Sequence, residues 1–238
     1  MTFLELVQEL HRESGAAGRA PTTVASVTGE AARLVGWIKK ANLAVQDLWE
    51  NWKFLRCEYS QALTSGTNTL SAPTTPNAIG SGMWDLDTFK LQRVSDTFAS
   101  PLVAVEYDEI KDEILDTTSS TPWRVTVMPD NSLRFEGTPN AADTVTADFY
   151  REPIRTEFDN TALNADDQES SIPAKFQQVI IGKALMYYGN YEGAVEAKTQ
   201  GKELYDDYLA RLENSELPNG GKSRYRVGKG KHIEVIAQ

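Results

Sequence analysis

The sequence predicts an α+β fold in which N- and C-terminal helices form a helical bundle, with an inserted small antiparallel β unit and an extended C-terminal tail. Towards both ends of the chain, apolar residues recur every three to four positions, which is the period of a helix that buries one face. The middle third consists of short segments with alternating or β-branched residues, bounded by Gly, Pro, Asn and Ser. We therefore expect a single domain over residues 1–217, with a helical part (1–53 and 171–217) and a β unit (54–155), followed by the tail (218–238).

Two amphipathic helices are expected at the N-terminal end. Thr2 can cap a first helix that runs to about Ser14, because its hydroxyl can accept a hydrogen bond from a free amide of the first turn. Thr28 occupies the same position before a second helix, which we expect to cover residues 28–53. The apolar stripe of this second helix has the strongest helical period in the chain and contains one polar residue, Asn42. We expect the stripe to face the core.

The β unit is expected to contain six strands. The segments with strand character are residues 54–63, 67–73, 83–94, 123–129, 132–137 and 144–153. Residues 129–132, with the sequence Pro-Asp-Asn-Ser, favour a hairpin turn between the fourth and fifth segments. Residues 104–115 instead have the spacing of a short helix.

A helical hairpin is expected over residues 171–217. Pro173 suits the first turn of a helix, where its missing N–H costs no hydrogen bond. Gly189 and Asn190 both tolerate the left-handed conformation that ends helices, so we expect the first helix to stop at residue 188. A second apolar stripe follows and predicts a partner helix that ends before Pro218.

The chain offers little catalytic chemistry. His11 and His232 lie on the first helix and in the tail, and neither has a convincing nucleophile and carboxylate beside it. Cys57 is the single cysteine, which excludes an internal disulfide and any multi-cysteine metal site. Residues 159–163 lack the alternating oxygen ligands and the central glycine of a calcium loop. We therefore expect a protein that is not an enzyme and uses no metal or cofactor.

The charge is unevenly distributed along the chain. Of 24 basic and 34 acidic residues, five basic residues and one acid, Glu234, lie within residues 219–238, so the net charge is +4 there and −14 elsewhere. An acidic surface repels nucleic acid, which argues against a protein that reads DNA sequence. No apolar run has the length of a membrane span, and the acidic N-terminus differs from a signal peptide. We expect no membrane partner.

The C-terminal tail combines positive charge with apolar residues. Tyr225 and Val227 alternate with Arg224 and Arg226, a pattern that would let the tail pair as a strand on a neighbouring protein. We predict docking on a partner protein, while a disordered basic end and nucleic-acid binding remain open alternatives. The candidate partner-binding residues are Lys222, Arg224, Tyr225, Arg226, Val227, Lys229, Lys231, Ile233 and Val235.

The parts of the chain follow one another in a distinctive order. A helix pair and an inserted β unit come first, then residues 133–139 (LRFEGTP) lead into residues 144–153 (TVTADFYREP), and a tyrosine-rich hairpin (PAKFQQVIIGKALMYYGNYEGA) ends in LENSELP. This order resembles the head-to-tail adaptor, or connector, proteins of tailed bacteriophages. The resemblance covers most of residues 1–217, and it concerns architecture more than chemistry.

The resemblance implies a structural virion protein that is not an enzyme. Adaptors of this kind assemble as a homo-oligomeric ring, usually of about twelve copies, beneath the portal of the capsid. The ring connects the portal to the tail or to the next neck component and continues the DNA ejection channel, through which genomic DNA passes without sequence-specific binding. C-terminal segments of such adaptors commonly reach the portal, which suits the docking tail. The expected location is the virion neck, at the head-tail junction, after assembly in the host cytoplasm.

A ring requires two different contact surfaces on each subunit. The expected helices at 28–53 and 173–188 carry more apolar surface than one core of this size obviously requires, so we predict that they form the ring interface. The candidate residues are Leu34, Ile38, Val45, Trp49, Phe176, Ile180, Tyr187 and Tyr188. Carboxylates on the channel wall would let DNA slide without sticking. The candidates for that wall are Glu106, Asp108, Glu109, Asp112, Glu113 and residues 166–169.

Two other functions remain open. Residues 186–194 resemble one tetratricopeptide-type helical pair, which would make the chain a peptide-binding module, although such arrays need at least three repeats to bury their faces. The other alternative is a different ring or tube component of the phage tail. Such components are mostly β and do not ordinarily begin and end with helices.

Overall fold

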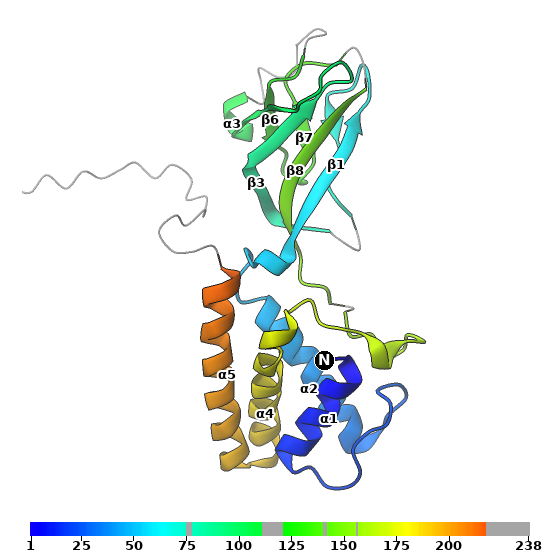
Figure 1. The fold of residues 1–238 in the computed structure, drawn as a ribbon, viewed down its shortest axis with the longest axis vertical. Coiled ribbons are helices and arrows are strands. Elements are labelled where there is room, and N and C mark those ends of the chain that lie inside the picture. Colours follow the sequence, from blue (N-terminus) through cyan, green and yellow to red (C-terminus); the bar gives the residue numbers. More distant parts are fainter. Residues whose placement is uncertain (75–77, 111–120, 140–141, 156, 218–238) are drawn as a thin grey trace, which may run out of the picture.

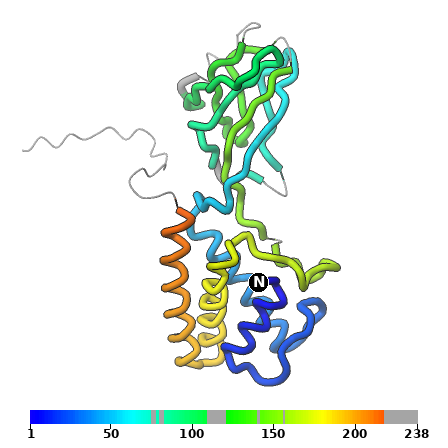
Figure 2. The backbone as a smooth tube through the Cα atoms, viewed as in Figure 1, coloured from blue at the N-terminus to red at the C-terminus, as the bar shows by residue number. Residues whose placement is uncertain are grey.

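The structure is a computed structural model that describes residues 1–74, 78–110, 121–139, 142–155 and 157–217. A helical part lies at one end of the molecule and a β unit at the other, and the chain passes from one to the other and back through two connections (Figures 1 and 2). The helices are α1 (Phe3–Ser14), α2 (Gly29–Gln46), α3 (Tyr107–Ile110), α4 (Gln178–Glu192) and α5 (Val195–Glu216). The predicted α+β class is confirmed.

The β unit consists of two sheets that share one apolar core. The strands are β1 (Arg56–Leu63), β2 (Thr69–Leu70), β3 (Ile79–Gln92), β4 (Ser100–Pro101), β5 (Val103–Val105), β6 (Arg124–Val127), β7 (Leu133–Phe135) and β8 (Asp143–Arg151). The sheet orders are β1-β8-β3-β4 and β2-β7-β6-β5. Alternate residues of β8 are buried, as expected for a strand with one face on the core. Trp84 lies at the centre of this core, with ring centroids 5.1 Å from Tyr59 and 5.6 Å from Phe149.

The helical part has a separate apolar core around α4. This helix contacts α1, α2 and α5, and its apolar residues are buried around most of its circumference (Figure 1). The start of α1 is fixed by Thr2, whose hydroxyl accepts a hydrogen bond from the Glu5 amide, while the Glu5 carboxylate accepts one from the Thr2 amide. The predicted cap at Thr2 is therefore confirmed.

Helices α4 and α5 approach each other unusually closely. Gly182 and Gly189 on α4 face Gly201 and the backbone around it on α5. A Cβ added to Gly182 would lie 2.6 Å from the Tyr205 amide nitrogen, and one added to Gly201 would lie 2.7 Å from Leu185 Cβ. The two backbones can pack this closely only because these positions carry no side chain.

The helix ends differ from the predicted ones in three places. Helix α4 begins at Gln178, after a separate 3₁₀ turn at Ala174–Phe176 that follows Pro173. Helix α2 stops at Gln46, because the chain then turns so that Trp52 is fully buried and stacks on Phe54, with ring centroids 5.4 Å apart. Helix α4 continues through Gly189 and ends at Gly193, which adopts φ 68°. The prediction of a break at Gly189 and Asn190 was wrong, since Gly189 serves the close approach to α5.

The β unit also corrects two expectations. Residues 104–115 were predicted as a short helix, but Val103–Val105 form strand β5, and α3 begins only at Tyr107. Residues 111–120 lie outside the described part of the chain. The expected antiparallel pairing holds for the other described strand pairs and has one exception, because β5 pairs with β6 in parallel. The predicted turn at 129–132 is confirmed by the antiparallel β6–β7 pair, in which Asn131 adopts φ 63°.

Tyr59 is expected to make the β unit less stable at alkaline pH. Burial raises the pKa of this phenol from 10.0 to about 12. The phenol therefore ionises first in the unfolded chain, and stability present below pH 10 is lost as the pH rises towards 12. We expect a loss on the order of 2 kcal/mol from this residue, measured by urea unfolding at a series of pH values. The Tyr59→Phe variant should show a shallower decline, and an unchanged decline would contradict the assignment.

Candidate functional site

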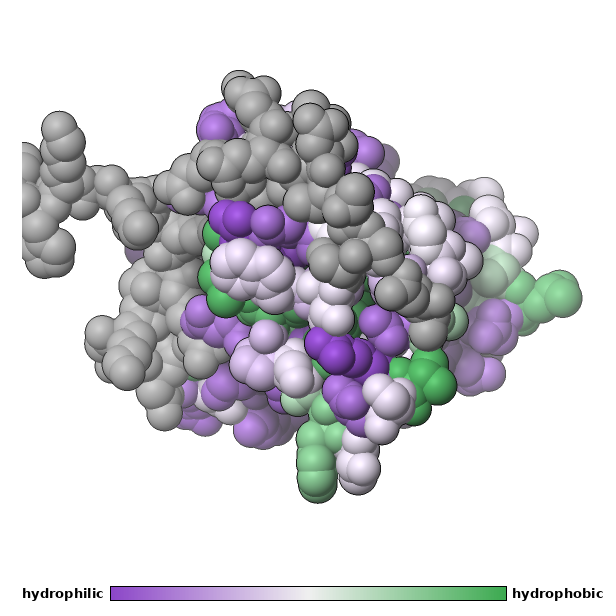
Figure 3. All heavy atoms as spheres, turned by 90° about the horizontal axis from the view of Figure 1, so that it is seen from above, coloured by the Kyte–Doolittle hydropathy of each residue, from purple (hydrophilic) through white to green (hydrophobic). Residues whose placement is uncertain are grey.

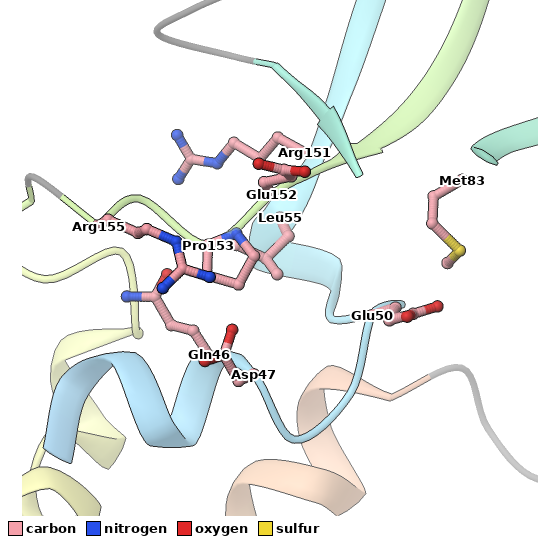
Figure 4. Close-up of a pocket in the computed structure, with 9 residues that line it drawn as sticks. All are labelled: Gln46, Asp47, Glu50, Leu55, Met83, Arg151, Glu152, Pro153 and Arg155. Carbon is pink, nitrogen blue, oxygen red and sulfur yellow. The ribbon is translucent and has the colours of Figure 1, made fainter. Parts of the chain in front are cut away.

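The two connections between the helical part and the β unit meet at a small pocket. Its volume is about 200 Å³, and it is lined by Gln46, Asp47, Glu50, Leu55, Met83, Arg151, Glu152, Pro153 and Arg155 (Figure 4). The residues after α2 and the residues after β8 supply most of this lining. Carboxylates and guanidinium groups both line it, so the pocket has no single charge that would select an anion or a cation.

Glu157 forms the polar centre of this junction. Its Oε2 atom accepts hydrogen bonds from Asn42 Nδ2 and from Gln46 Nε2, each at 2.6 Å. Its Oε1 atom accepts one from the Ser171 amide at 2.7 Å and another from the Ser171 hydroxyl. Asn42, the one polar residue of the predicted apolar stripe, also accepts a hydrogen bond from the Ser170 hydroxyl. The Glu157 carboxylate therefore links α2 to Ser171, in the segment that leads into α4.

The acidic segment before α4 is also used within the chain. Asp166 Oδ1 accepts hydrogen bonds from the Val24 amide at 2.6 Å and from the Thr23 hydroxyl at 3.1 Å. The main chain of Gln168 accepts a hydrogen bond from the Phe3 amide at 2.6 Å. Of the carboxylates predicted for a channel wall, Asp166 thus holds the loop before α2, whereas Asp167 and Glu169 are exposed.

The other carboxylates that were predicted for the channel wall lie near α3. The side chains of Glu106 and Asp108 are exposed. Asp112 and Glu113 lie outside the described residues, as does the side chain of Glu109. Both lie at the end of the molecule formed by the β unit (Figure 1).

A face formed by α2 and α4 combines cations with tyrosines, and we call it the basic face: Arg33, Lys40, Lys183, Tyr187 and Tyr191. The Arg33 guanidinium lies 4.7 Å from the ring centroid of Tyr191. The Lys40 ammonium lies 4.6 Å from the centroid of the Tyr187 ring. The Lys183 ammonium lies between two rings, 5.9 Å from the centroid of Tyr187 and 4.7 Å from that of Tyr205 on α5. Burial raises the pKa of Tyr187, which keeps the ring neutral. Cations gather here on a chain whose net charge is −10.

Exposed apolar side chains occur on the β unit. Val103 and Trp123 are about half exposed and adjacent, since the Val103 amide donates to the Trp123 carbonyl at 2.9 Å. Val94 and Phe98, in the segment between β3 and β4, are 75% and 82% exposed. Figure 3 looks down on this end of the molecule and shows hydrophobic residues as separate groups between hydrophilic ones. Such scattered groups suit the rim of a contact better than an apolar docking groove.

Most of the predicted ring-interface residues lie in the core of this chain. Leu34, Ile38, Val45 and Ile180 are fully buried, and Phe176 and Tyr188 are nearly so. The half-buried members are Trp49, whose Nε1 donates to Glu213 at 2.9 Å, and Tyr187 on the basic face. Of the eight candidates, Trp49 and Tyr187 therefore keep the most surface accessible to solvent. The cations beside Tyr187, which are Arg33, Lys40 and Lys183, were not among the predicted interface residues.

The described residues contain no site suited to redox or metal chemistry. Among them, no three His, Cys, Asp or Glu side chains lie together as metal ligands would. Burial raises the pKa of the Cys57 thiol above its ordinary 9.0, against the smaller opposing effect of Arg151. The reactive thiolate is therefore disfavoured. None of the described helices is long and apolar enough to cross a membrane.

The predicted tail residues, from Lys222 to Val235, lie outside the described part of the chain. The last described helix, α5, ends next to the junction, where Lys53 Nζ donates to the Ser215 carbonyl at 2.7 Å. Helix α5 therefore ends on the side of the helical part that faces the β unit (Figure 1).

Comparison with known protein families identifies a matching family. Residues 1–227 match a protein-family model whose description is "SU10 adaptor protein". No curated protein matches the sequence. The matched region contains both the helical part and the β unit, and it extends into the tail.

Proposed function

Because the chain belongs to the SU10 adaptor protein family, we propose that it forms a ring that connects the portal of a phage capsid to the tail or next neck component. Membership confirms the resemblance to phage head-to-tail adaptors that the order of the parts predicted, and it implies a structural role in the virion. The match over residues 1–227 is the observation that carries the proposal. In this role the protein is not an enzyme and needs no cofactor.

Residues 1–217 would act as one adaptor domain. Glu157 lies in the connection that follows β8, and its hydrogen bonds to Asn42 and Ser171 hold this connection on the helical part, beside the pocket. Such a junction supports a subunit that transmits load between two neighbours in the neck. The proposed location is the head-tail junction.

The tail, residues 218–238, would bind the portal. It begins where α5 meets the junction, and its basic and apolar residues alternate. A strand-like arm of this kind gains affinity from main-chain hydrogen bonds to a partner sheet. Genomic DNA would pass through the lumen of the ring without sequence-specific contacts, because most of the chain is acidic. Glu106 and Asp108 are the exposed candidates for a wall near this path.

The test measures the mass of the chain and of a version that ends at Pro218, each with and without a portal ring from the same virus. We expect the full-length chain to join the portal in a fixed ratio, about twelve copies if the ring matches its relatives. The shortened chain should bind at least about tenfold more weakly, since it lacks the proposed arm. A matched control replaces residues 218–238 with a Gly/Ser segment of equal length.

Two results would contradict the proposal. Failure of the full-length chain to join any portal ring would remove the connector role. Equal portal binding by the shortened chain would remove the role of the tail and leave the connector role in place.

A further inference from the structure

We infer that neighbouring subunits meet through two oppositely charged helix faces: the basic face of one copy binds the acidic outer face of α5 in the next copy. The acidic face is defined as Glu196, Glu203 and Asp206. This inference rests on the proposed function and names the contact from which the ring is built.

The three cations of the basic face form no ion pair among the described residues, although carboxylates lie nearby. Burial, together with Glu192 and Glu30, raises the pKa of the neighbouring Tyr188. Each of the three cations lies over a tyrosine ring. The two ammonium groups beside Tyr187 repel each other, and this repulsion costs less when an anion lies between them. Arg33 and Lys40 are exposed at the surface of α2. The arrangement thus favours an anionic partner from outside the subunit.

The acidic face is the opposite feature on another side of the same chain. Its three carboxylates are exposed and lie seven and three positions apart, which puts them on one side of a helix. That side points away from α4, because Gly201 and Tyr205 face α4 and are buried. None of the three carboxylates forms an ion pair with the described residues. Asp207 differs from them, since it pairs with Arg211 at 2.8 Å.

A second copy fits these observations better than DNA does. One chain carries both charges on different faces, so each copy can bind one neighbour through each face. A contact between two different faces is heterologous, and its repetition generates a ring when the rotation closes. DNA would have to overcome the acidic charge of the whole domain with only three clustered cations. Tyrosine and arginine are enriched in protein interfaces, and the basic face contains Tyr187, Tyr191 and Arg33.

The experiment reverses the charge of each face separately. The basic-face variant is Lys40→Glu with Lys183→Glu, and the acidic-face variant is Glu203→Lys with Asp206→Lys. Arg19→Glu with Lys90→Glu is the control for the basic-face variant, because both residues are exposed and lie outside the two faces. Sedimentation velocity at several salt concentrations, with and without a portal ring, gives the assembly state, and circular dichroism checks that each variant folds.

We expect the wild-type chain to assemble and its assembly to weaken as salt increases, because exposed charges are screened. Each face variant alone should lose self-association by about 100-fold or more, since like charges then meet across the contact. An equal mixture of the two variants restores opposite charges at both kinds of contact. An unchanged basic face meets an unchanged acidic face, and a reversed basic face meets a reversed acidic face, so the mixture should assemble again. The control variant should assemble as the wild type does.

Several outcomes would overturn the inference. Assembly of either face variant at the wild-type level would show that its face is not the contact, and a mixture that fails to assemble would show that the two faces do not bind each other. Normal assembly of the basic-face variant together with loss of binding to a labelled DNA duplex would assign that face to nucleic acid. If the wild type binds the portal in a fixed ratio in these cases, the proposed connector role stands while the contact is rejected.

Discussion

Replacing Gly201 with alanine is expected to lower the free energy of unfolding by about 3 kcal/mol. The new methyl group would lie 2.7 Å from Leu185 Cβ and 2.9 Å from the Gly182 carbonyl oxygen, both on α4. A carbonyl oxygen belongs to the main chain and cannot rotate aside, so the two helices must move apart. This separation would open the core beneath Tyr205 and Leu212, which are buried at the same contact.

Urea unfolding followed by circular dichroism measures this loss. The matched control is Gly36→Ala on α2, where no atom outside the helix lies within 4 Å of the added Cβ. Alanine should stabilise that exposed helical position by about 0.5–1 kcal/mol, because it restricts the unfolded chain. Equal effects of the two substitutions would show that α4 and α5 do not pack as closely as described.

Replacing Glu157 with alanine is expected to destabilise the chain by about 3–5 kcal/mol. The substitution removes the shared acceptor of four hydrogen bonds from Asn42, Gln46 and Ser171. Asn42 and Gln46 are 3% and 0% exposed, so their amide groups would lose their acceptor without gaining solvent. We expect the substitution to loosen the junction as well as to lower the stability of the helical core.

The control for Glu157 is Asp159→Asn, two residues further along the same connection. Among the described residues, the Asp159 carboxylate accepts hydrogen bonds only from the hydroxyl and the amide of Thr161, and these lower the pKa of the Asp159 carboxyl. We expect a change of about 0.5 kcal/mol or less at this exposed local turn. Limited proteolysis of the two connections supplies a second measurement, and faster cleavage of only the Glu157 variant is the expected result. Comparable stability of both variants would refute the role of Glu157.

Local patterns predicted much of the fold. The three-to-four period gave α1 and the α4–α5 hairpin, and strand alternation gave β8 with its buried face. Short strands were harder to predict from the sequence. Strands β4 and β5 have too few residues to show a period, and they are defined by their partner strands. The end of α2 was also predicted wrongly. Trp52 continues the apolar stripe of the sequence, and this pattern is the same whether Trp52 lies on the helix or beyond its end, stacked on Phe54.

The candidate surfaces were less predictable than the fold. Periodicity identifies apolar residues that become buried, and six of the eight residues chosen for the ring interface lie in the core. The basic face depends on residues from α2 and α4 that are far apart in the sequence, so no local motif marks it. A weak signal existed in the spacing of Arg33 and Lys40 on the polar side of the second helix.

The sequence by itself determined the α+β class, the order of the parts, the acidic body with its basic tail, and the resemblance to phage adaptors. These properties follow from local composition and period, which each segment carries with it. Only the tertiary structure decided that α4 lies at the centre, that three glycines permit the contact with α5, and that Glu157 joins the parts. It also decided which charges remain unpaired on the surface. Those features depend on distances between residues remote in sequence, and such distances are set by packing, which no local pattern encodes.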